Sequence, residues 1–195
     1  METEIKFSIL PGDLMEYGSL LSGLGAVSVE SFDQEDVYYS HPKLDAVYRL
    51  RKNEATCSSY LRKNNVLFTV KDCADKKSTI KIRVEKETYV TSYETVIELM
   101  KVMGFSEDCS VSKNPRLSYE LDGCRVELDF DVKIYRGYRL GSFLEIEGPT
   151  KKAIRVVMKK LNLKEEDAVK ESYYQLAAEI WSKKNAKKKV KNKRT

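Results

Sequence analysis

The sequence predicts an α+β protein in which antiparallel strands dominate and helices pack against the sheet. Three observations support this prediction. Many short runs alternate between apolar and polar residues, four segments place apolar residues at helical spacing, and several strands carry charges of one sign on one face. A solvent-facing sheet explains the alternation by default, whereas a closed barrel with a polar interior explains the charges of one sign. Both interpretations remain open at this level.

Nine runs have the composition and the two-residue period of β-strands. The letters "KNN" between the fourth and the fifth run are typical of a hairpin turn. The nine predicted strands are Glu2–Leu10, Val27–Ser40, Ala46–Lys52, Ser58–Lys63, Val66–Lys71, Thr79–Tyr89, Cys109–Arg116, Arg125–Val132 and Gly137–Gly148.

Four segments predict helices with one apolar face each, as helices packed on a sheet have. In the first, Asp13 is the expected N-cap and Gly25 the expected end. The second begins with an expected capping box of Thr91 and Glu94. The four segments are residues 11–25, 91–104, 149–161 and Glu165–Trp181.

Length and composition limit the class of protein. The 195 residues suit one domain, and 33% charged against 42% hydrophobic residues is globular but rich in charge. No apolar run is long enough for a membrane span, and the amino terminus lacks the layout of a signal peptide. We therefore expect a cytoplasmic protein without membrane contact.

Cysteine and histidine usage restricts the metal chemistry. The four cysteines form no CxxC pair, so reduced thiols are the simplest expectation. A single histidine, His41, excludes a zinc site of the usual kind. Any metal would be a hard cation held by oxygen ligands.

The net charge of +5 comes from the carboxyl terminus. The segment from Lys183 to Arg194 carries eight basic residues and no acidic one, which leaves 27 basic against 30 acidic residues elsewhere. The sequence predicts a folded domain over residues 1–182 and a disordered basic tail over residues 183–195. Such a tail suits weak, salt-sensitive contact with polyanions.

Charged residues two positions apart share one face of a strand. Carboxylates bind divalent cations, and arginine and lysine bind phosphate oxygens, so opposed clusters suit a concave site for a metal and a polyanion. In addition, Lys113 and Arg116 bracket the stretch "KNPR". The sets that share a face are Glu2, Glu4 and Lys6; Arg49 and Arg51; Thr69 and Lys71; Arg83, Glu85 and Glu87; Glu127, Asp129 and Asp131; and Glu145 and Glu147.

Short motifs in one order along the chain resemble the CYTH superfamily, the triphosphate tunnel metalloenzymes. "ETEIKF" resembles its ExExK motif, "YRLR" its LRxR strand, "FTVK" its TxK strand and "IRVEKE" its RxExE strand. "VSKNPR", "VELD" and "LGSFLEIEG" are similar to the KxxR, LD and LGxFxEIE elements. "QEDVYYSHP" and "ESYYQL" look like stretches of class IV adenylyl cyclases and their relatives.

The resemblance implies a closed eight-stranded antiparallel β-barrel with helices outside and a bore that binds a triphosphate with Mg²⁺ or Mn²⁺. It implies metal ligands at Glu2, Glu4, Asp129, Glu145 and Glu147. It implies phosphate contacts at Lys6, Arg49, Arg51, Lys71, Arg83, Lys113 and Arg116, and catalytic roles for Glu85, which would also face the metal, and Lys71.

Two departures from the family pattern leave the activity open. Asp72 and Cys73 follow Lys71 where cyclases usually have Gly-Pro. The segment from Asp129 to Leu140 is longer than the usual LDxVxxLG, and it offers both Asp129 and Asp131 with the same parity. The leading expectation is a class IV adenylyl cyclase-like enzyme. The alternatives are an inorganic tripolyphosphatase or a thiamine or nucleoside triphosphate phosphohydrolase, and a non-catalytic polyphosphate- or RNA-binding protein. A monomer and a homodimer are both compatible with the sequence.

Overall fold

A computed structural model describes residues 2–56, 65–72, 78–134 and 137–180. The predicted strand Ser58–Lys63 and the basic tail, residues 183–195, lie outside the described residues, as do Cys57 and Cys73. Within the described part of the chain, no helix has the length and apolar character needed to cross a membrane.

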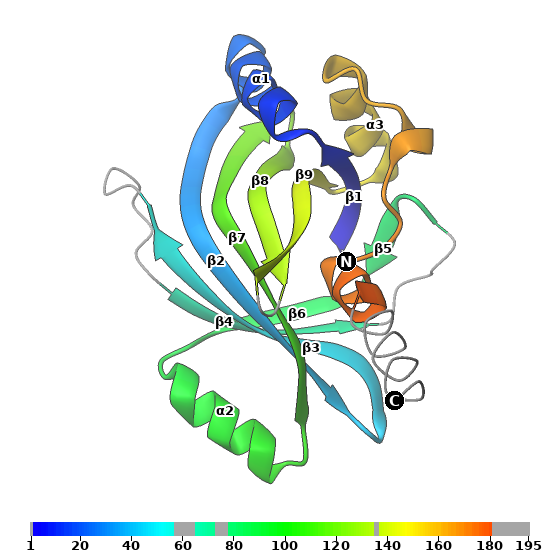
Figure 1. The fold of residues 1–195 in the computed structure, drawn as a ribbon. Helices are drawn as coiled ribbons and strands as arrows, with labels where there is room; N and C mark the ends of the chain where they lie inside the picture. Colours follow the sequence, from blue (N-terminus) through cyan, green and yellow to red (C-terminus); the bar gives the residue numbers. More distant parts are fainter. Residues whose placement is uncertain (1, 57–64, 73–77, 135–136, 181–195) are drawn as a thin grey trace, which may run out of the picture.

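The described residues form one sheet in which every pair of neighbouring strands is antiparallel (Figure 1). The order across the sheet is β5-β1-β9-β8-β7-β2-β3-β4-β6. The strands are β1 (Glu2–Ile9), β2 (Val27–His41), β3 (Leu44–Ala55), β4 (Asn65–Asp72), β5 (Lys81–Arg83), β6 (Glu85–Val90), β7 (Ser106–Leu121), β8 (Cys124–Ile134) and β9 (Tyr138–Gly148).

The two outermost strands of this order are consecutive in the chain, so the sheet closes on itself. Only Val84 separates β5 from β6, and its carbonyl accepts a hydrogen bond from the amide of Asp72 on β4 (3.0 Å). The predicted strand Thr79–Tyr89 is therefore interrupted at Val84. With β5 and β6 counted as one strand, the expected eight-stranded antiparallel barrel with outer helices is confirmed, and the barrel is nearly closed.

The helices begin close to the predicted positions, but two of the predicted caps are wrong. Leu10 is the N-cap of the first helix, and Pro11 is the first helical residue, so Asp13 lies in the first turn. Ser92, and not Thr91, caps the second helix, where its hydroxyl accepts from the amide of Thr95 (3.2 Å). The helices are α1 (Pro11–Gly23), α2 (Tyr93–Val102), α3 (Lys151–Lys160) and residues 173–180.

The predicted helix Glu165–Trp181 is divided into two parts. Glu165–Asp167 form a single 3₁₀ turn, and the helix starts only at residue 173. Between them, Ala168 pairs with Phe7, and the amide of Val169 donates to the carbonyl of Lys6 (2.7 Å). The segment thus runs along β1 before the helix begins, because these two backbone groups find their partners on that strand.

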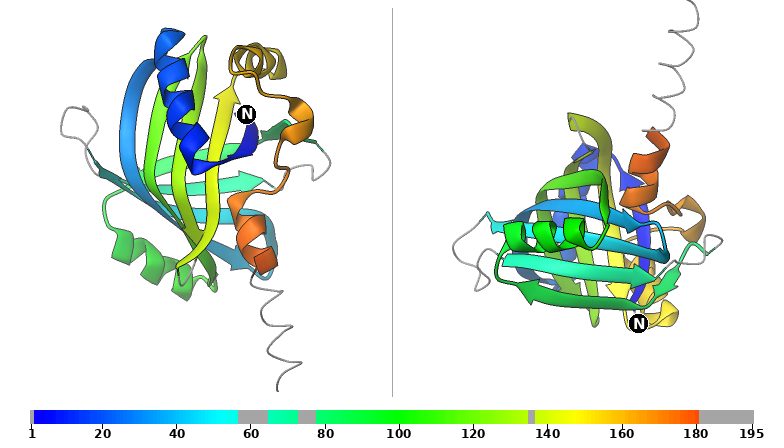
Figure 2. Two further views of the ribbon diagram at one scale, coloured as in Figure 1. Left: turned by 45° about the horizontal axis from the view of Figure 1, so that its top comes forward. Right: turned by 90° about the horizontal axis from the view of Figure 1, so that it is seen from below.

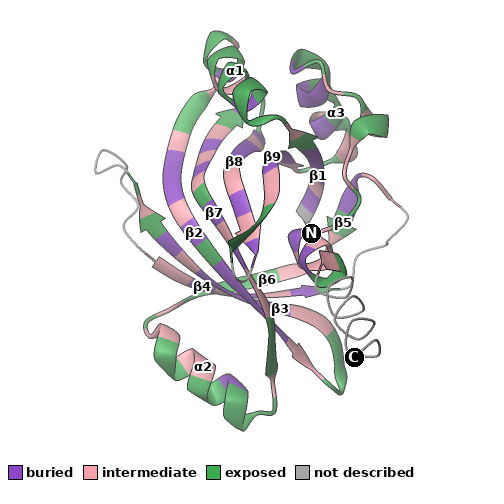
Figure 3. Ribbon diagram, viewed as in Figure 1, coloured by how far each residue is buried: buried purple, intermediate pink, exposed green. Residues whose placement is uncertain are grey.

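Helices α1, α2 and α3 lie outside the barrel (Figure 2), and many strand residues are buried (Figure 3). Apolar side chains pack between these helices and the strands. Helices α1 and α3 cover β1, β8 and β9 with residues such as Leu14, Ile154 and Val157, and α2 covers β2 and β3 with Met100. The helix at residues 173–180 packs on a third cluster. Because each strand alternates between its faces, the opposite face of these strands points into the barrel.

Candidate functional site: a charged cavity inside the barrel

The barrel encloses a cavity of about 440 Å³ that is lined mainly by charged and polar side chains. All seven cations expected to bind phosphate line it: Lys6, Arg49, Arg51, Lys71, Arg83, Lys113 and Arg116. Four of the expected carboxylates line it as well: Glu4, Glu85, Glu145 and Glu147. Eleven of the predicted residues therefore surround one space. Lys113 and Arg116 have opposite parity on β7, and both line it because the pairing with β2 shifts between them. Asp129 lies behind the wall of the cavity, fully buried, and Glu2 pairs with Arg83 in the sheet register.

Carboxylates from neighbouring strands are crowded at β1, β8 and β9. Glu4 lies opposite Glu147, and Glu145 lies opposite Glu127. Residues opposite one another have Cβ atoms about 4.5–5.5 Å apart. Burial raises the pKa of Glu147, and the charges of Glu127 and Glu145 raise it further. This part of the cavity carries negative charge that is only partly compensated.

Arg116 pairs with three carboxylates at once, among them Glu127 and Glu145. Its Nε and Nη2 donate to the two carboxylate oxygens of Asp129 (2.5 and 2.6 Å), and Nη2 also donates to Glu145 (2.5 Å). Its Nη1 forms an ion pair with Glu127. Burial would raise the pKa of Glu145, but Arg116, Lys113 and Lys6 together hold this pKa below its usual range. The Arg116 guanidinium is thus the centre of a buried network.

The structure separates the two aspartates that the sequence left as alternatives. A register shift between Asp129 and Val132 interrupts the pairing of β8 with β9, and Asp131 has a φ of 43°. Asp131 forms ion pairs with Lys133 (2.5 Å) and with Arg139 (3.0 Å), outside the cavity. Asp129 contacts Arg116 and also accepts a hydrogen bond from the hydroxyl of Tyr173 (2.5 Å).

The opposite wall has a looser set of ion pairs. Arg49 donates to Glu85 and to Glu87, both at 3.3 Å, and to the hydroxyl of Thr69 (3.2 Å). Lys71 pairs with Glu85 (2.6 Å). Glu87 is partly exposed. The cavity is lined by all four charged residues of this set: Arg49, Lys71, Glu85 and Glu87. The expected catalytic pair, Glu85 and Lys71, is therefore in direct contact.

Two lysines at one end of the cavity have lowered pKa values. Burial lowers the pKa of Lys6 to about 7, against the opposing effect of Glu145. Burial, followed by the charge of Arg116, lowers the pKa of Lys113 to about 8. Both ammonium groups lie over the ring of Tyr173, at 4.1 and 4.6 Å from its centroid.

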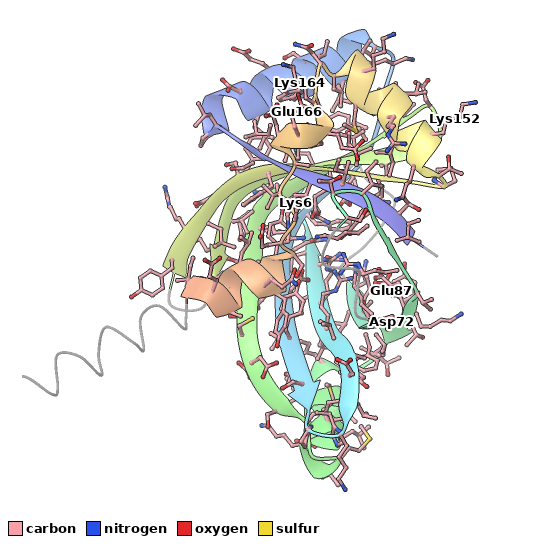
Figure 4. All side chains as sticks on the ribbon, turned by 90° about the vertical axis from the view of Figure 1, so that its right-hand side faces the viewer. Lys6, Asp72, Glu87, Lys152, Lys164 and Glu166 are labelled. Carbon is pink, nitrogen blue, oxygen red and sulfur yellow. The ribbon has the colours of Figure 1, made fainter. Side chains whose placement is uncertain are left out.

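The start of the carboxyl-terminal helix closes this end of the cavity. Ser172, Tyr173 and Tyr174 are among the lining residues, and Tyr173 is almost fully buried. Figure 4 shows Lys6 beside this segment in the middle of the molecule, whereas Lys152, Lys164 and Glu166 lie on the outer surface. The stretch "ESYYQL" thus contributes directly to the site.

Several cavity residues were not predicted from the sequence. They are Glu30, Phe32, Gln34, Asn53, Asn65 and Arg125, together with Asp36 behind the wall. Asp36 accepts from Nε and Nη2 of Arg51 (2.6 and 2.9 Å), and so fixes the guanidinium of that residue. Parity grouped Glu87 and Glu127 with the predicted residues of their strands, but the sequence assigned no role to them. On β2 both faces are polar, so parity carried no signal there.

The carboxylates fit a divalent cation by the chemistry of their donor atoms. Mg²⁺ and Mn²⁺ prefer oxygen ligands, and Glu4, Glu145 and Glu147 line the same cavity. Among the side chains that the structure describes, no three acidic, histidine or cysteine groups are already gathered as ligands. The raised pKa of Glu147 indicates repulsion that a cation beside it would relieve.

An antiparallel barrel, nearly closed, with helices outside and cations and carboxylates lining its bore, defines the class of the protein as a barrel with a charged tunnel. The chain belongs to the CYTH domain family, whose match extends over residues 1–173. The curated proteins include no match to this chain.

Solved structures of other proteins share this fold. The PH1012 protein from Pyrococcus horikoshii OT3 is 31% identical, with a TM-score of 0.71 over 90% of this chain and 99% of that one. A conserved hypothetical protein from Pyrococcus furiosus is 26% identical, with a TM-score of 0.72 over 90% and 99%. A candidate adenylate cyclase from Vibrio parahaemolyticus is 17% identical, with a TM-score of 0.64 over 88% and 94%, which is a likeness of fold.

Proposed function

We propose that the protein is a divalent-metal-dependent enzyme that acts on a triphosphate bound inside the barrel, in the manner of a class IV adenylyl cyclase. The observation that carries this proposal is that all seven expected cations and four of the expected carboxylates line one cavity. Simple capture of an anion would be weakened by the carboxylates, whereas phosphoryl chemistry requires a metal beside the phosphates.

In this proposal, Glu4, Glu145 and Glu147 hold the metal together with Glu2, and Asp129 supports them by fixing Arg116. The metal, when bound, would neutralise phosphate charge and align the reacting groups. Arg49, Arg83 and the lysines of the cavity bind the phosphate oxygens.

Glu85 and Lys71 are the proposed catalytic residues. Their contact of 2.6 Å places an acceptor for a proton next to a donor for a phosphate oxygen. In a cyclase the ribose 3′-hydroxyl attacks the α-phosphorus and pyrophosphate leaves, whereas in a hydrolase water attacks the terminal phosphorus. Glu85 would accept the proton of either nucleophile. The same cavity serves both reactions, because they differ in which phosphorus meets the nucleophile.

A product assay tests the proposal. The protein is incubated with ATP and with tripolyphosphate, each with Mg²⁺ and with Mn²⁺, and cyclic AMP, pyrophosphate and orthophosphate are measured. We expect metal-dependent product from at least one substrate, and none from the Glu85→Gln variant. Cyclic AMP with pyrophosphate identifies a cyclase, and orthophosphate identifies a hydrolase. Tight binding of tripolyphosphate without any product would instead support a non-catalytic binding protein.

A further inference from the structure

Three carboxamide side chains form a row across neighbouring strands inside the barrel. Gln34 on β2 lies opposite Asn53 on β3, and Asn53 lies opposite Asn65 on β4. All three side chains line the cavity. None of them is needed to bind phosphate or metal in the function proposed above.

Two acceptor atoms of this row have no hydrogen-bond partner among the described residues. Nδ2 of Asn53 donates to Oδ1 of Asn65 (2.9 Å), but Oδ1 of Asn53 and Oε1 of Gln34 have no donor. Asn53 and Gln34 are each only 5% exposed. Buried polar groups are nearly always paired, and an unpaired one lowers stability. The row is therefore incomplete without a ligand that supplies donors.

Apolar side chains flank the row on the same face. Phe32 is two residues before Gln34 on β2, and Leu67 is two residues after Asn65 on β4, so each pair shares a face. Phe32 and Leu67 both line the cavity, and both are almost fully buried. This part of the cavity offers apolar contact, including the ring of Phe32, beside amide groups.

The chemistry of the row selects its ligand. Phosphate oxygens only accept hydrogen bonds from an amide group, so a phosphate would leave both buried acceptors unpaired. The edge of a nucleobase presents a donor next to an acceptor, which a carboxamide satisfies through both of its atoms. The apolar faces of Phe32 and Leu67 suit the flat surface of such a base.

We propose that Gln34, Asn53 and Asn65, with Phe32 and Leu67, form a subsite for the base of a nucleoside triphosphate. This inference rests on the proposed function, because the phosphates must bind the cations of the same cavity. Arg51 is two residues before Asn53 on β3, and Lys113 lies opposite Gln34 on β7. The base end of the ligand therefore continues directly into the phosphate-binding residues. The substrate is then an organic triphosphate and not inorganic tripolyphosphate.

Calorimetric titration with two probes tests the subsite. The probes are the bis-methylene analogues of ATP and of tripolyphosphate, in which bridging carbons prevent turnover, with Mg²⁺ present. The variants Gln34→Met and Asn53→Leu keep the side-chain size and remove the amide groups. We expect each variant to bind the ATP analogue about tenfold more weakly than the wild type does. Its affinity for the tripolyphosphate analogue should stay within about twofold of the wild-type value. The Arg49→Met variant is the matched control and should weaken both probes.

The outcomes separate the two proposals. Equal losses for both probes, or no loss for either, would overturn the base subsite while leaving the proposed function in place. A wild-type protein that binds neither probe would overturn both. Thermal melting shows whether each variant is folded. The wild-type protein alone gives a second measurement, because it should bind the ATP analogue at least about tenfold more tightly than the tripolyphosphate analogue. Equal wild-type affinities would contradict the subsite without any variant.

Discussion

The ion pairs on the two walls of the cavity differ in how far they are buried. On the β7–β9 wall, Arg116 and Asp129 form an ion pair whose side chains are 3% and 0% exposed. On the β3–β6 wall, the side chains of Arg49 and Glu87 are 8% and 38% exposed. Helices α1 and α3 back β8 and β9, and α2 backs β2 and β3. The Arg116 network on the first wall is thus paired within the protein, whereas the second wall holds charges that a ligand can reach.

Because burial differs, substitutions of similar charged residues on the two walls should have different effects. Removing one partner of a buried ion pair leaves an uncompensated charge and costs about 3–5 kcal/mol, whereas an exposed pair contributes about 0–1 kcal/mol. We therefore expect loss of Arg116 or one of its three carboxylate partners to change stability, and loss of Arg49 to change ligand binding. The following predictions test this division, beginning with the largest expected effect.

Arg116→Met should lower the free energy of unfolding by about 3–5 kcal/mol, because three buried carboxylates lose their shared partner. Urea unfolding at pH 7 measures this change. Arg139→Met is the matched control, since Arg139 is 74% exposed, and it should change stability by less than about 0.5 kcal/mol. Similar losses in both variants would show that the wall does not depend on buried pairing.

The stability difference between wild type and Arg116→Met should depend on pH. Arg116 helps to hold the pKa of Glu145 below its usual range in the folded protein. A lowered pKa stabilises the fold above the unfolded value, about 4.3, and this contribution is lost as the pH falls through the folded value. The advantage of the wild type should therefore shrink below about pH 4. Unfolding curves at pH 7, 5 and 3 measure it, and a constant difference would contradict the assignment.

Glu147→Gln should lower turnover by about a hundredfold or more and leave the fold intact, because this carboxylate serves the metal. Burial and the charges of Glu127 and Glu145 raise its pKa, so a neutral amide at this position relieves repulsion. The product assay and thermal melting measure the two effects, with Glu98→Gln on the exposed face of α2 as the control. Glu4→Gln should behave in the same way. Normal turnover at limiting metal would contradict the metal assignment.

Arg49→Met should weaken the binding of a triphosphate by about one to two orders of magnitude and that of AMP much less. One charge-assisted contact is worth about 1.5–3 kcal/mol. Titration with tripolyphosphate and with AMP measures the difference, and Arg139→Met again serves as the control. Arg51 is less suitable for this test, because its loss would also leave buried Asp36 without its partner. Equal small losses for both ligands would show that Arg49 does not contact the phosphates.

Deletion of residues 183–195 should change turnover of a small triphosphate by less than about twofold. Apart from Ala186 and Val190 this segment has no apolar residue, so it can bury little surface. The product assay measures the effect at low and at physiological salt. A large loss with a small substrate would show that the tail contributes to the site.

The inward-facing charges were predictable because strand parity is insensitive to errors in strand ends. Arg83, Glu85 and Glu87 still share a face although the chain breaks between β5 and β6. The predicted N-caps at Asp13 and Thr91 were wrong by three residues and by one. Leu10 precedes the first helix without a side-chain cap, and Ser92 stands directly after Thr91. The outer helices, the nearly closed barrel and the family were thus all accessible from the sequence.

The remaining part of the site could not be predicted because its residues lack a pattern. Along β2, Ser31, Asp33 and Glu35 are polar like the inward Gln34 and Asp36, so alternation was hidden. The bulge after Asp129 depends on pairing with β9, which no local pattern reveals. The contact of Tyr173 with Lys6 joins residues from the two ends of the domain.

The single residue between β5 and β6 also bears on how the protein behaves in solution. Since β5 pairs with β1 and β6 pairs with β4, one stretch of chain occupies both borders of the sheet. Within the described strands, the sheet therefore ends on two short strands, of three and six residues, and not on a long edge that could template a strand from another molecule. By dividing this stretch between the two borders, Val84 keeps the open edges of a charge-rich barrel short, which disfavours strand-by-strand aggregation at high concentration.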